Sequence, residues 1–320
     1  MSWKEVRINI INNINDQINI FRKTSNCNDE RVLRQNIIKI QYDVCKKIRK
    51  NFLNKICDYS KRNILSYYSG FIKSPQAMSS IIPFDRDVII SLMNNMDKRK
   101  GLDLILHTPG GRIDITESIV NYIKKIFNND VRVIIPSIAL SAGTMIALSS
   151  KEILMTNSSS IGPIDPQFGN GLSCKSSIEM FQRACLETMK EPRKLGIWQS
   201  ILKFHPTFLI DCEKAIKWSK TITEKWLNEN MFHSEKEENR KKIVQSILEN
   251  LDNEKTYFHG RHLNIQFAKQ IGLKVKNIEE EEEPELWKIL MDYYYACYET
   301  LWFCSDKIKI IESNHEDFLY

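Results

Sequence analysis

Two long segments at the start of the chain repeat apolar residues every three or four positions. They are residues 4–21, with Val6, Ile10, Ile14 and Ile18, and residues 31–56, with Leu33, Ile37, Ile40, Val44 and Ile48. This spacing places the apolar side chains on one face of an α-helix. The stretch SNCNDE between the two segments supplies turn and N-cap residues. The sequence therefore predicts an N-terminal helical hairpin over residues 1–57, whose apolar faces pack either on the core or on another subunit.

From residue 62 onward, short apolar runs alternate with segments of helical spacing. Residues 102–107 (LDLILH) are nearly continuously apolar, which indicates a strand that is buried on both faces. Strands are predicted at residues 62–71, 102–107, 131–137 and 151–156, and helices at residues 85–96, 112–127 and 142–150. Strands and helices that alternate with short connections are typical of a parallel sheet built from right-handed crossovers. The expected fold class is therefore α/β, with a core over residues 58–275.

After Asp165 the spacing of apolar residues becomes mainly helical. Helices are predicted at residues 176–190, 208–228, 238–251 and 285–303, together with a short helix that Asn264 caps and Gly272 ends. We expect residues 176–255 to form a helical insertion in the core, and residues 276–320 to form C-terminal helical additions. In this last segment five glutamates at 279–283 form an acidic loop, which we interpret as the solvated entry to an aromatic-rich helix.

Charge and cysteine content exclude several classes of protein. The formal charge of +6 comes from 46 Lys and Arg against 40 Asp and Glu, an excess spread along the chain that does not argue for nucleic acid. Eight cysteines are scattered, without a C-x-x-C pair or a Cys/His cluster at metal-ligand spacing. The sequence has neither a signal-peptide core nor a membrane-spanning apolar run. We therefore expect a cytoplasmic protein with no metal, no nucleotide cofactor and no transmembrane segment.

Two glycine-containing turns follow consecutive predicted strands, HTPGGR at 107–112 and SIALSAGT at 137–144. The carboxyl ends of neighbouring parallel strands meet at one edge of a sheet, where ligands bind. In the first turn Gly110 and Gly111 permit backbone dihedrals that other residues avoid. An amide N–H of this turn can therefore be exposed as a hydrogen-bond donor to an oxyanion. We expect both turns to face one crevice.

Ser141 lies in the second turn, between a predicted strand and a short helix. Ala142 and Gly143 are small enough for a substrate backbone to approach, which makes Ser141 the best-placed nucleophile of the chain. Taken alone, Ser141 is better explained as the N-cap of the helix, and Pro-Gly-Gly as an ordinary tight turn. The pairing of the two turns favours a chemical role over these simpler interpretations.

Residues 100–167, from KGLDLILHTPGGR through SIALSAGTMIALSSKEILMT to GPIDPQ, resemble the central block of the serine dehydrogenase proteinase family. This family is related to signal peptide peptidase A and to Clp-type proteases. The similarity extends backward through NILSYYSG and forward to HGRHLNIQFAKQIGLKV. The resemblance implies a crotonase/Clp-like spiral of parallel strands and helices. It also implies a serine peptidase that holds an extended polypeptide beside a strand edge and forms a homo-oligomer.

By this resemblance Ser141 is the nucleophile, the amides of Gly111 and Ala142 are the oxyanion donors, and Gly110 and Gly143 adjoin the substrate. The general base departs from the family pattern. A serine hydroxyl needs a proton acceptor within about 3 Å, because it is a weak nucleophile at its free pKa. Clp-type proteases have a His downstream of the Ser, where this chain reads GPIDPQ.

Several residues remain open as the base. They are Asp165, as base or base-orienting group; Lys190 or Lys194, which correspond in position to the lysine of signal peptide peptidases; and His259 or His262. A desolvated lysine would be neutral near pH 7 and could accept a proton. Asp165 is alternatively a turn acid before Pro166, and a lone His is more often structural. A base from another subunit, or no base, also remains open. His107 is interpreted as a strand-end residue that could touch substrate.

Three functions follow from these patterns. The first is a serine peptidase that works through an acyl-enzyme on Ser141. The second is a non-catalytic scaffold that binds extended peptides, which the missing His motivates. The third is crotonase-like chemistry on acyl thioesters with the same pair of amide donors. The sequence does not decide whether an ATPase feeds the crevice.

Overall fold

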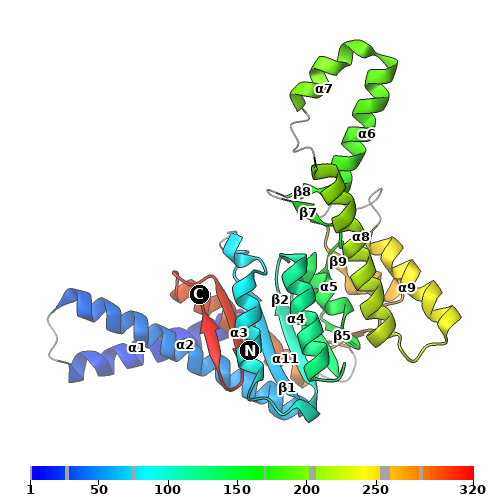
Figure 1. Cartoon of the computed structure of the whole chain (residues 1–320). Helices are drawn as coiled ribbons and strands as arrows, with labels where there is room; N and C mark the ends of the chain where they lie inside the picture. Colours follow the sequence, from blue (N-terminus) through cyan, green and yellow to red (C-terminus); the bar gives the residue numbers. More distant parts are fainter. Residues whose placement is uncertain are drawn as a thin grey trace.

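The computed structural model describes residues 2–25, 29–73, 77–168, 171–201, 207–252, 260–280 and 284–320. It has an α/β body from which two long helices extend on one side and a helical arm projects on the other (Figure 1). Short 3-10 turns, η1 (Ala77–Ser79) and η2 (Lys98–Lys100), connect elements of the body. None of the helices in these described ranges combines the length and the apolarity needed to cross a membrane.

A sheet in the order β10–β5–β3–β2–β1–β11–β12 forms the centre of the described body. Its strands are β1 (Asn63–Ser69), β2 (Leu102–His107), β3 (Val131–Ile135), β5 (Glu152–Met155), β10 (Val275–Asn277), β11 (Lys309–Ser313) and β12 (Asp317–Leu319). The strands from β10 to β1 run parallel, and β11 and β12 extend the sheet in antiparallel fashion. Every residue of the central strand β2 is buried, which confirms the prediction of a strand covered on both faces.

Alternate residues of the central strands belong to different apolar cores. Leu104 and Leu106 of β2 face one core, whereas Ile105 between them faces the other. The first core is covered by α3 (Pro83–Met93), α4 (Ile113–Ile126), α5 (Ala142–Leu148), α8 (Phe208–Trp226), α9 (Glu237–Leu251) and α10 (Ile265–Gln270). Between α8 and α9 the chain forms a π-helical turn, η4 (Leu227–Met231).

The second core is covered by α1 (Trp3–Thr24), α2 (Glu30–Ser60) and α11 (Pro284–Phe303). Ile10 of α1, Leu53 of α2 and Leu290 of α11 are fully buried in it. The N-terminal helices are therefore confirmed, and their apolar faces pack on the core of their own chain. Figure 1 shows that the far ends of α1 and α2 reach beyond the body.

β3 ends at Ile135, earlier than predicted, because Pro136 has no N–H to continue the ladder. The chain then enters a small second sheet of β4 (Ile138–Ala139), β6 (Ser160–Ile161) and β9 (Leu263–Asn264). A single parallel bridge between Thr108 and Ala139 joins the end of β2 to β4. The ends of the two strands that carry the glycine turns are thus tied together.

The arm comprises residues 174–201: α6 (Cys174–Lys190), the 3-10 turn η3 (Pro192–Lys194) and α7 (Leu195–Ile201). It follows a short antiparallel pair, β7 (Gln167–Phe168) and β8 (Leu172–Ser173), and projects away from the body (Figure 1). Large exposed apolar side chains are frequent on it: Met180, Phe181, Leu186, Met189, Leu195, Ile197 and Ile201. The arm therefore presents apolar surface that the single chain does not cover.

The expectation of C-terminal helical additions is incomplete. α11 is present, but the residues after it form β11 and β12, and β11 pairs with β1. The sequence KIIES hides this strand because Lys309 and Glu312 carry charge, yet both are fully buried against ionic partners. Residues 281–283 of the acidic run lie outside the described residues.

Candidate active site

Ser141 occupies a strained turn between β4 and α5. Its backbone dihedrals are φ 52° and ψ −117°, a region that is costly for any residue with a Cβ atom. Its side chain makes no capping hydrogen bond to α5, so the interpretation of Ser141 as an ordinary N-cap is wrong. In some hydrolases a strained strand-to-helix turn exposes the nucleophilic serine in this way.

The diglycine turn after β2 lies directly against Ser141. Gly110 has φ +105°, and a Cβ added to it would lie 2.8 Å from Ser141 Cβ and 3.1 Å from the amide nitrogen of Ala142. Glycine tolerates both this dihedral and this close approach. The predicted meeting of the two turns at one edge of the sheet is confirmed.

Gly111 is held by a parallel bridge to Ile81. The N–H of Ile81 donates to the carbonyl of Gly110 at 2.8 Å, and the N–H of Arg112 donates to the carbonyl of Ile81 at 3.1 Å. Neither bond uses the N–H of Gly111. A Cβ at Gly111 would lie 2.3 Å from the nitrogen of Ile81, so the bridge requires glycine here.

In the turn that carries Ser141, the hydrogen bonds of the described residues likewise do not use one amide N–H, that of Ala142. The N–H of Gly143 donates to Leu140 at 2.8 Å, and that of Met145 donates to Ser141 at 3.1 Å. Within the described part of the chain, no partner is recorded for the N–H of Ala142 or of Gly111. Two unpaired amides that border the same cavity as a serine hydroxyl are what an oxyanion hole requires.

Both turns open on a cavity of about 740 Å³, a volume within the range of ligand-binding clefts. Its apolar wall is formed by Ile113, Met145, Ile164, Phe168, Ala215 and Trp218, and its polar side chains are Ser80, Arg112, Asp114, Ser141, Asp165, Gln167 and Ser219. Gly110, Gly111 and Ala142 also line it. The cavity therefore combines an apolar pocket with the Ser141 hydroxyl and the unpaired amides of Gly111 and Ala142.

Gly143 differs from its predicted role beside the substrate. It is not among the residues that line the cavity, and a Cβ on it would lie 2.5 Å from Thr108 Cγ2. Its lack of a side chain lets α5 pack closely on the end of β2.

Two carboxylates line the cavity. Asp114 pairs with Arg112 at 2.6 Å, and the hydrogen bond from Arg112 lowers the pKa of Asp114, which weakens it as a base. Asp165 lies in the wall contributed by the segment after β6 and is only 9% exposed. Of the two carboxylates, Asp165 is therefore the better candidate for accepting or relaying a proton.

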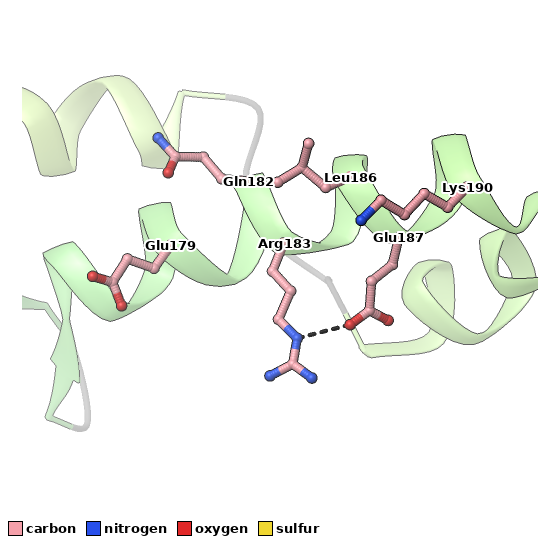
Figure 2. Close-up of a pocket in the computed structure, with 6 residues that line it drawn as sticks. All are labelled: Glu179, Gln182, Arg183, Leu186, Glu187 and Lys190. Atoms are coloured by element: carbon pink, nitrogen blue, oxygen red, sulfur yellow. Dashed lines mark hydrogen bonds and ion pairs between the residues drawn. The ribbon is translucent and has the colours of Figure 1, made fainter.

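Neither candidate lysine reaches this cavity in the single chain. Lys190 lies on a face of α6 with Glu179, Gln182 and Glu187, where Arg183 pairs with Glu187 (Figure 2). Lys194 forms ion pairs with Glu187 at 3.5 Å and with Glu191 at 3.3 Å. Both lysines belong to the projecting arm.

Of the candidate histidines, His262 is not among the residues that line the cavity with Ser141. His262 is exposed, and its Nδ1 is 2.7 Å from Ser160 Oγ. His259 lies outside the described residues. Among the residues that the structure describes, neither a histidine nor a lysine lines the cavity.

His107 is sealed among aromatic rings instead of touching substrate. Its ring centroid lies 4.8 Å from that of Tyr68, 5.1 Å from Phe71 and 5.2 Å from Tyr294. Burial lowers the pKa of His107 to about 3, and neither ring nitrogen has a hydrogen-bond partner in the described structure. The ring is therefore neutral at physiological pH.

Two parts of the cavity lining, the Ser80–Ile82 segment and Trp218, are not identified from the sequence. Ser80, Ile81 and Ile82 line the cavity, although no motif marks them, because they reach it only by bridging to Gly111. Trp218 enters from α8, and its indole N–H donates to Glu117 of α4 at 2.9 Å. Its helical spacing in the sequence signals only an apolar face.

Comparison with known proteins agrees with this geometry. A model of ClpP-like SDH-type serine proteinases matches residues 81–298, which include both turns. Two uncharacterized proteins of Methanocaldococcus jannaschii are similar. MJ0137 is 39% identical over 85 residues, 27% of this chain and 29% of that protein. MJ1495 is 27% identical over 192 residues, 60% of this chain and 57% of that protein. The matched segments thus span less than two thirds of either relative. Since the family model covers more than half of the chain, the resemblance is confirmed, and the protein belongs to the ClpP-like SDH-type serine proteinases.

Proposed function

We propose that this protein is a serine peptidase. The Oγ of Ser141 attacks the scissile carbonyl carbon while a base takes the hydroxyl proton, and the N–H groups of Gly111 and Ala142 bind the resulting oxyanion. Collapse of the tetrahedral intermediate expels the amine with a proton and leaves an acyl-enzyme, which water hydrolyses. The observation that carries the proposal is the contact between the strained Ser141 turn and the diglycine turn, in one cavity with two unpaired amides.

We propose that the substrate is a polypeptide in extended form. The segment at Ser80–Ile82 and the diglycine turn supply backbone along the cavity wall, where an extended chain can form main-chain hydrogen bonds. The apolar wall with Met145 and Trp218 suits an uncharged side chain of the substrate. No cofactor is required by this chemistry.

We propose Asp165 as the base within a single chain, since it lines the cavity and is only 9% exposed, whereas the hydrogen bond from Arg112 lowers the pKa of Asp114, the other carboxylate among the described lining residues. A lysine from another copy is the alternative, because Lys190 and Lys194 lie on the arm. We propose that the chain forms a homo-oligomer through this arm, whose exposed apolar residues include Leu186 and Met189. An ATPase partner is left open.

The crotonase/Clp-like spiral is the fold that we propose for the body, in line with its parallel strands and its small second sheet. We also propose a cytoplasmic location. The seven cysteines that the structure describes are all free thiols, as expected in a reducing compartment.

Hydrolysis of casein and of a quenched fluorescent peptide library tests the proposal. Wild-type protein should cleave, and Ser141→Ala should not, whereas Ser149→Ala in the same helical segment should keep activity because Ser149 is absent from the cavity lining. Equal cleavage by wild type and Ser141→Ala would refute a nucleophilic role for Ser141.

A non-catalytic peptide-binding scaffold is the second candidate. It is favoured by the lack of a histidine or lysine among the described residues that line the cavity. In that case peptides would bind intact, with equal affinity for wild type and Ser141→Ala, and no fragment would form.

A further inference from the structure

A fully buried ion pair lies beneath the active-site wall. Lys309 Nζ lies 2.8 and 3.0 Å from the two carboxylate oxygens of Asp85, and neither side chain is exposed to solvent. The hydroxyl of Tyr67 donates to the same carboxylate at 2.8 Å. The rings of Tyr67 and Tyr320 lie 5.3 and 5.0 Å from the ammonium group. The pair joins β11 to the start of α3, on the sheet face that also carries the cavity.

Both members of the pair bind the backbone of the segment that holds the diglycine turn. Lys309 Nζ donates to the carbonyl of Ser80 at 2.9 Å, and Asp85 accepts the N–H of Ile82 at 3.0 Å. Ile81 lies between these two anchors. Its own N–H and C=O are the groups that bond to Gly110 and Arg112 on either side of Gly111.

A chain of direct contacts therefore runs from the ion pair to the oxyanion donor. The ion pair fixes the peptide groups before and after Ile81, Ile81 fixes those before and after Gly111, and Gly111 borders the cavity with Ser141. A rigid supporting shell of this kind keeps a donor within a few tenths of an ångström of its productive position.

Stability alone is a weak reason for such a pair. The cost of removing two charges from water offsets most of their attraction, and apolar residues of similar size usually stabilise a core as well. Two directional hydrogen bonds to a single backbone segment, in contrast, cannot be reproduced by apolar side chains.

We propose that Lys309 and Asp85 are positioning residues, which hold the Ser80–Ile82 segment so that the N–H of Gly111 is fixed at the oxyanion hole. This inference rests on the proposed peptidase function. The family model matches residues 81–298, and Lys309 lies outside this range. The residue that supports the Ser80–Ile82 segment therefore comes from β11, the C-terminal strand that the sequence pattern did not predict.

The chain supplies a matched control. Arg49 and Glu312 form a second fully buried ion pair. Arg49 Nε lies 2.9 Å from Glu312 Oε1, and neither side chain is accessible to solvent. Glu312 is also in β11, but it faces the opposite core and binds Arg49 of α2. In the described structure Arg49 donates its hydrogen bonds to Glu312 and Thr300, and neither residue belongs to the Ser80–Ile82 segment.

The test compares Lys309→Met/Asp85→Leu with Arg49→Met/Glu312→Leu. Both double variants exchange a buried ion pair for apolar residues, and both are checked for folding by circular dichroism. A fluorophosphonate probe then gives the limiting rate of modification and the half-saturating probe concentration. A displacement of a catalytic donor by about 1 Å can reduce the rate about 100-fold. The limiting rate of modification of Lys309→Met/Asp85→Leu should therefore be about 10- to 100-fold lower than that of wild type, with an unchanged half-saturating probe concentration. The control should stay within about twofold of wild type.

Hydrogen–deuterium exchange provides a second readout that needs no catalysis. In Asp85→Asn the amides of Ile81 and Arg112 should exchange at least about 10-fold faster than in wild type, while those of β2 keep their protection. Equal reaction rates for the two double variants, or equal loss of protection in β2, would overturn the positioning role. Failure of wild type to react with the probe would count against the peptidase function alone, since the exchange result decides the positioning role independently.

Discussion

Gly110→Ala isolates the contact on which the active site depends. Gly110 has φ +105°, and its new Cβ would lie 2.8 Å from both Ser141 Cβ and the carbonyl oxygen of Leu140. Both atoms belong to the turn that carries Ser141, so the substitution strains the diglycine turn and pushes it away from Ser141. No catalytic group is removed.

The size of the effect follows from contact distances. Carbon atoms in ordinary contact lie about 3.5 to 4.0 Å apart, so the two turns must separate by about 0.7 Å or more. A shift of that order reduces rates by about 10- to 100-fold when it misplaces a catalytic donor. In addition, the positive φ that the alanine of Gly110→Ala would have to adopt should lower the free energy of unfolding by about 1 to 3 kcal/mol.

Gly272→Ala is the control, because Gly272 also has positive φ (+95°) but its added Cβ meets only Ile243 Cγ2 at an ordinary 3.7 Å. Thermal unfolding and the rate of fluorophosphonate modification are measured for both variants. Each should be destabilised, but only Gly110→Ala should react slowly. If Gly110→Ala reacts at the rate of wild type, the reaction at Ser141 does not depend on the position of the diglycine turn, and the reasoning is refuted.

Three further predictions concern other parts of the molecule. Ser141→Gly should be more stable to urea than Ser141→Ala by about 1 to 3 kcal/mol, because glycine relieves the strain at φ 52°; equal stability would contradict that strain. Burial lowers the pKa of His107 to about 3, so the unfolded state binds its proton first as pH falls. The contribution of neutral His107 to the free energy of unfolding is fully present above the pKa of about 6.5 that His has in the unfolded state. It declines as the pH falls below that value, by about 2 kcal/mol at pH 5. His107→Phe should remove that pH dependence from urea unfolding curves, and an unchanged slope would refute the assignment. Leu186→Lys/Met189→Lys on the arm should lower the oligomeric state in sedimentation velocity while leaving Tm nearly unchanged, whereas an unaltered sedimentation coefficient would exclude these side chains from the interface.

The sequence predicts the centre of the site because local patterns encode it. A continuously apolar run identifies β2 as a buried strand, and the glycine turn after it must then lie at the carboxyl edge of the sheet. This reasoning points to Ser141 and to an amide of the diglycine turn, and the resemblance to the proteinase family singles out Gly111. Their contact depends only on neighbouring strands, which chain order and crossover handedness fix.

The remainder of the site depends on contacts between distant segments. β11 escapes prediction because Lys309 and Glu312 break its apolar pattern, and their partners Asp85 and Arg49 lie more than two hundred residues away. Ile81 carries no motif and acquires its role only by bridging to Gly111. The role of Gly143 is misjudged for the same reason, since only the fold reveals Thr108 against it. Sequence spacing cannot select the base, because it does not reveal that Lys190 and Lys194 lie on an arm that projects away from the body and does not line the cavity.

The most direct test of the central claim is to locate the covalent adduct of a fluorophosphonate on the intact protein. Peptide mass mapping after reaction should find one modification, on Ser141, and the fully modified protein should have lost its hydrolytic activity. A modification on any other residue that abolishes hydrolysis, or full hydrolytic activity with Ser141 completely modified, would contradict the account.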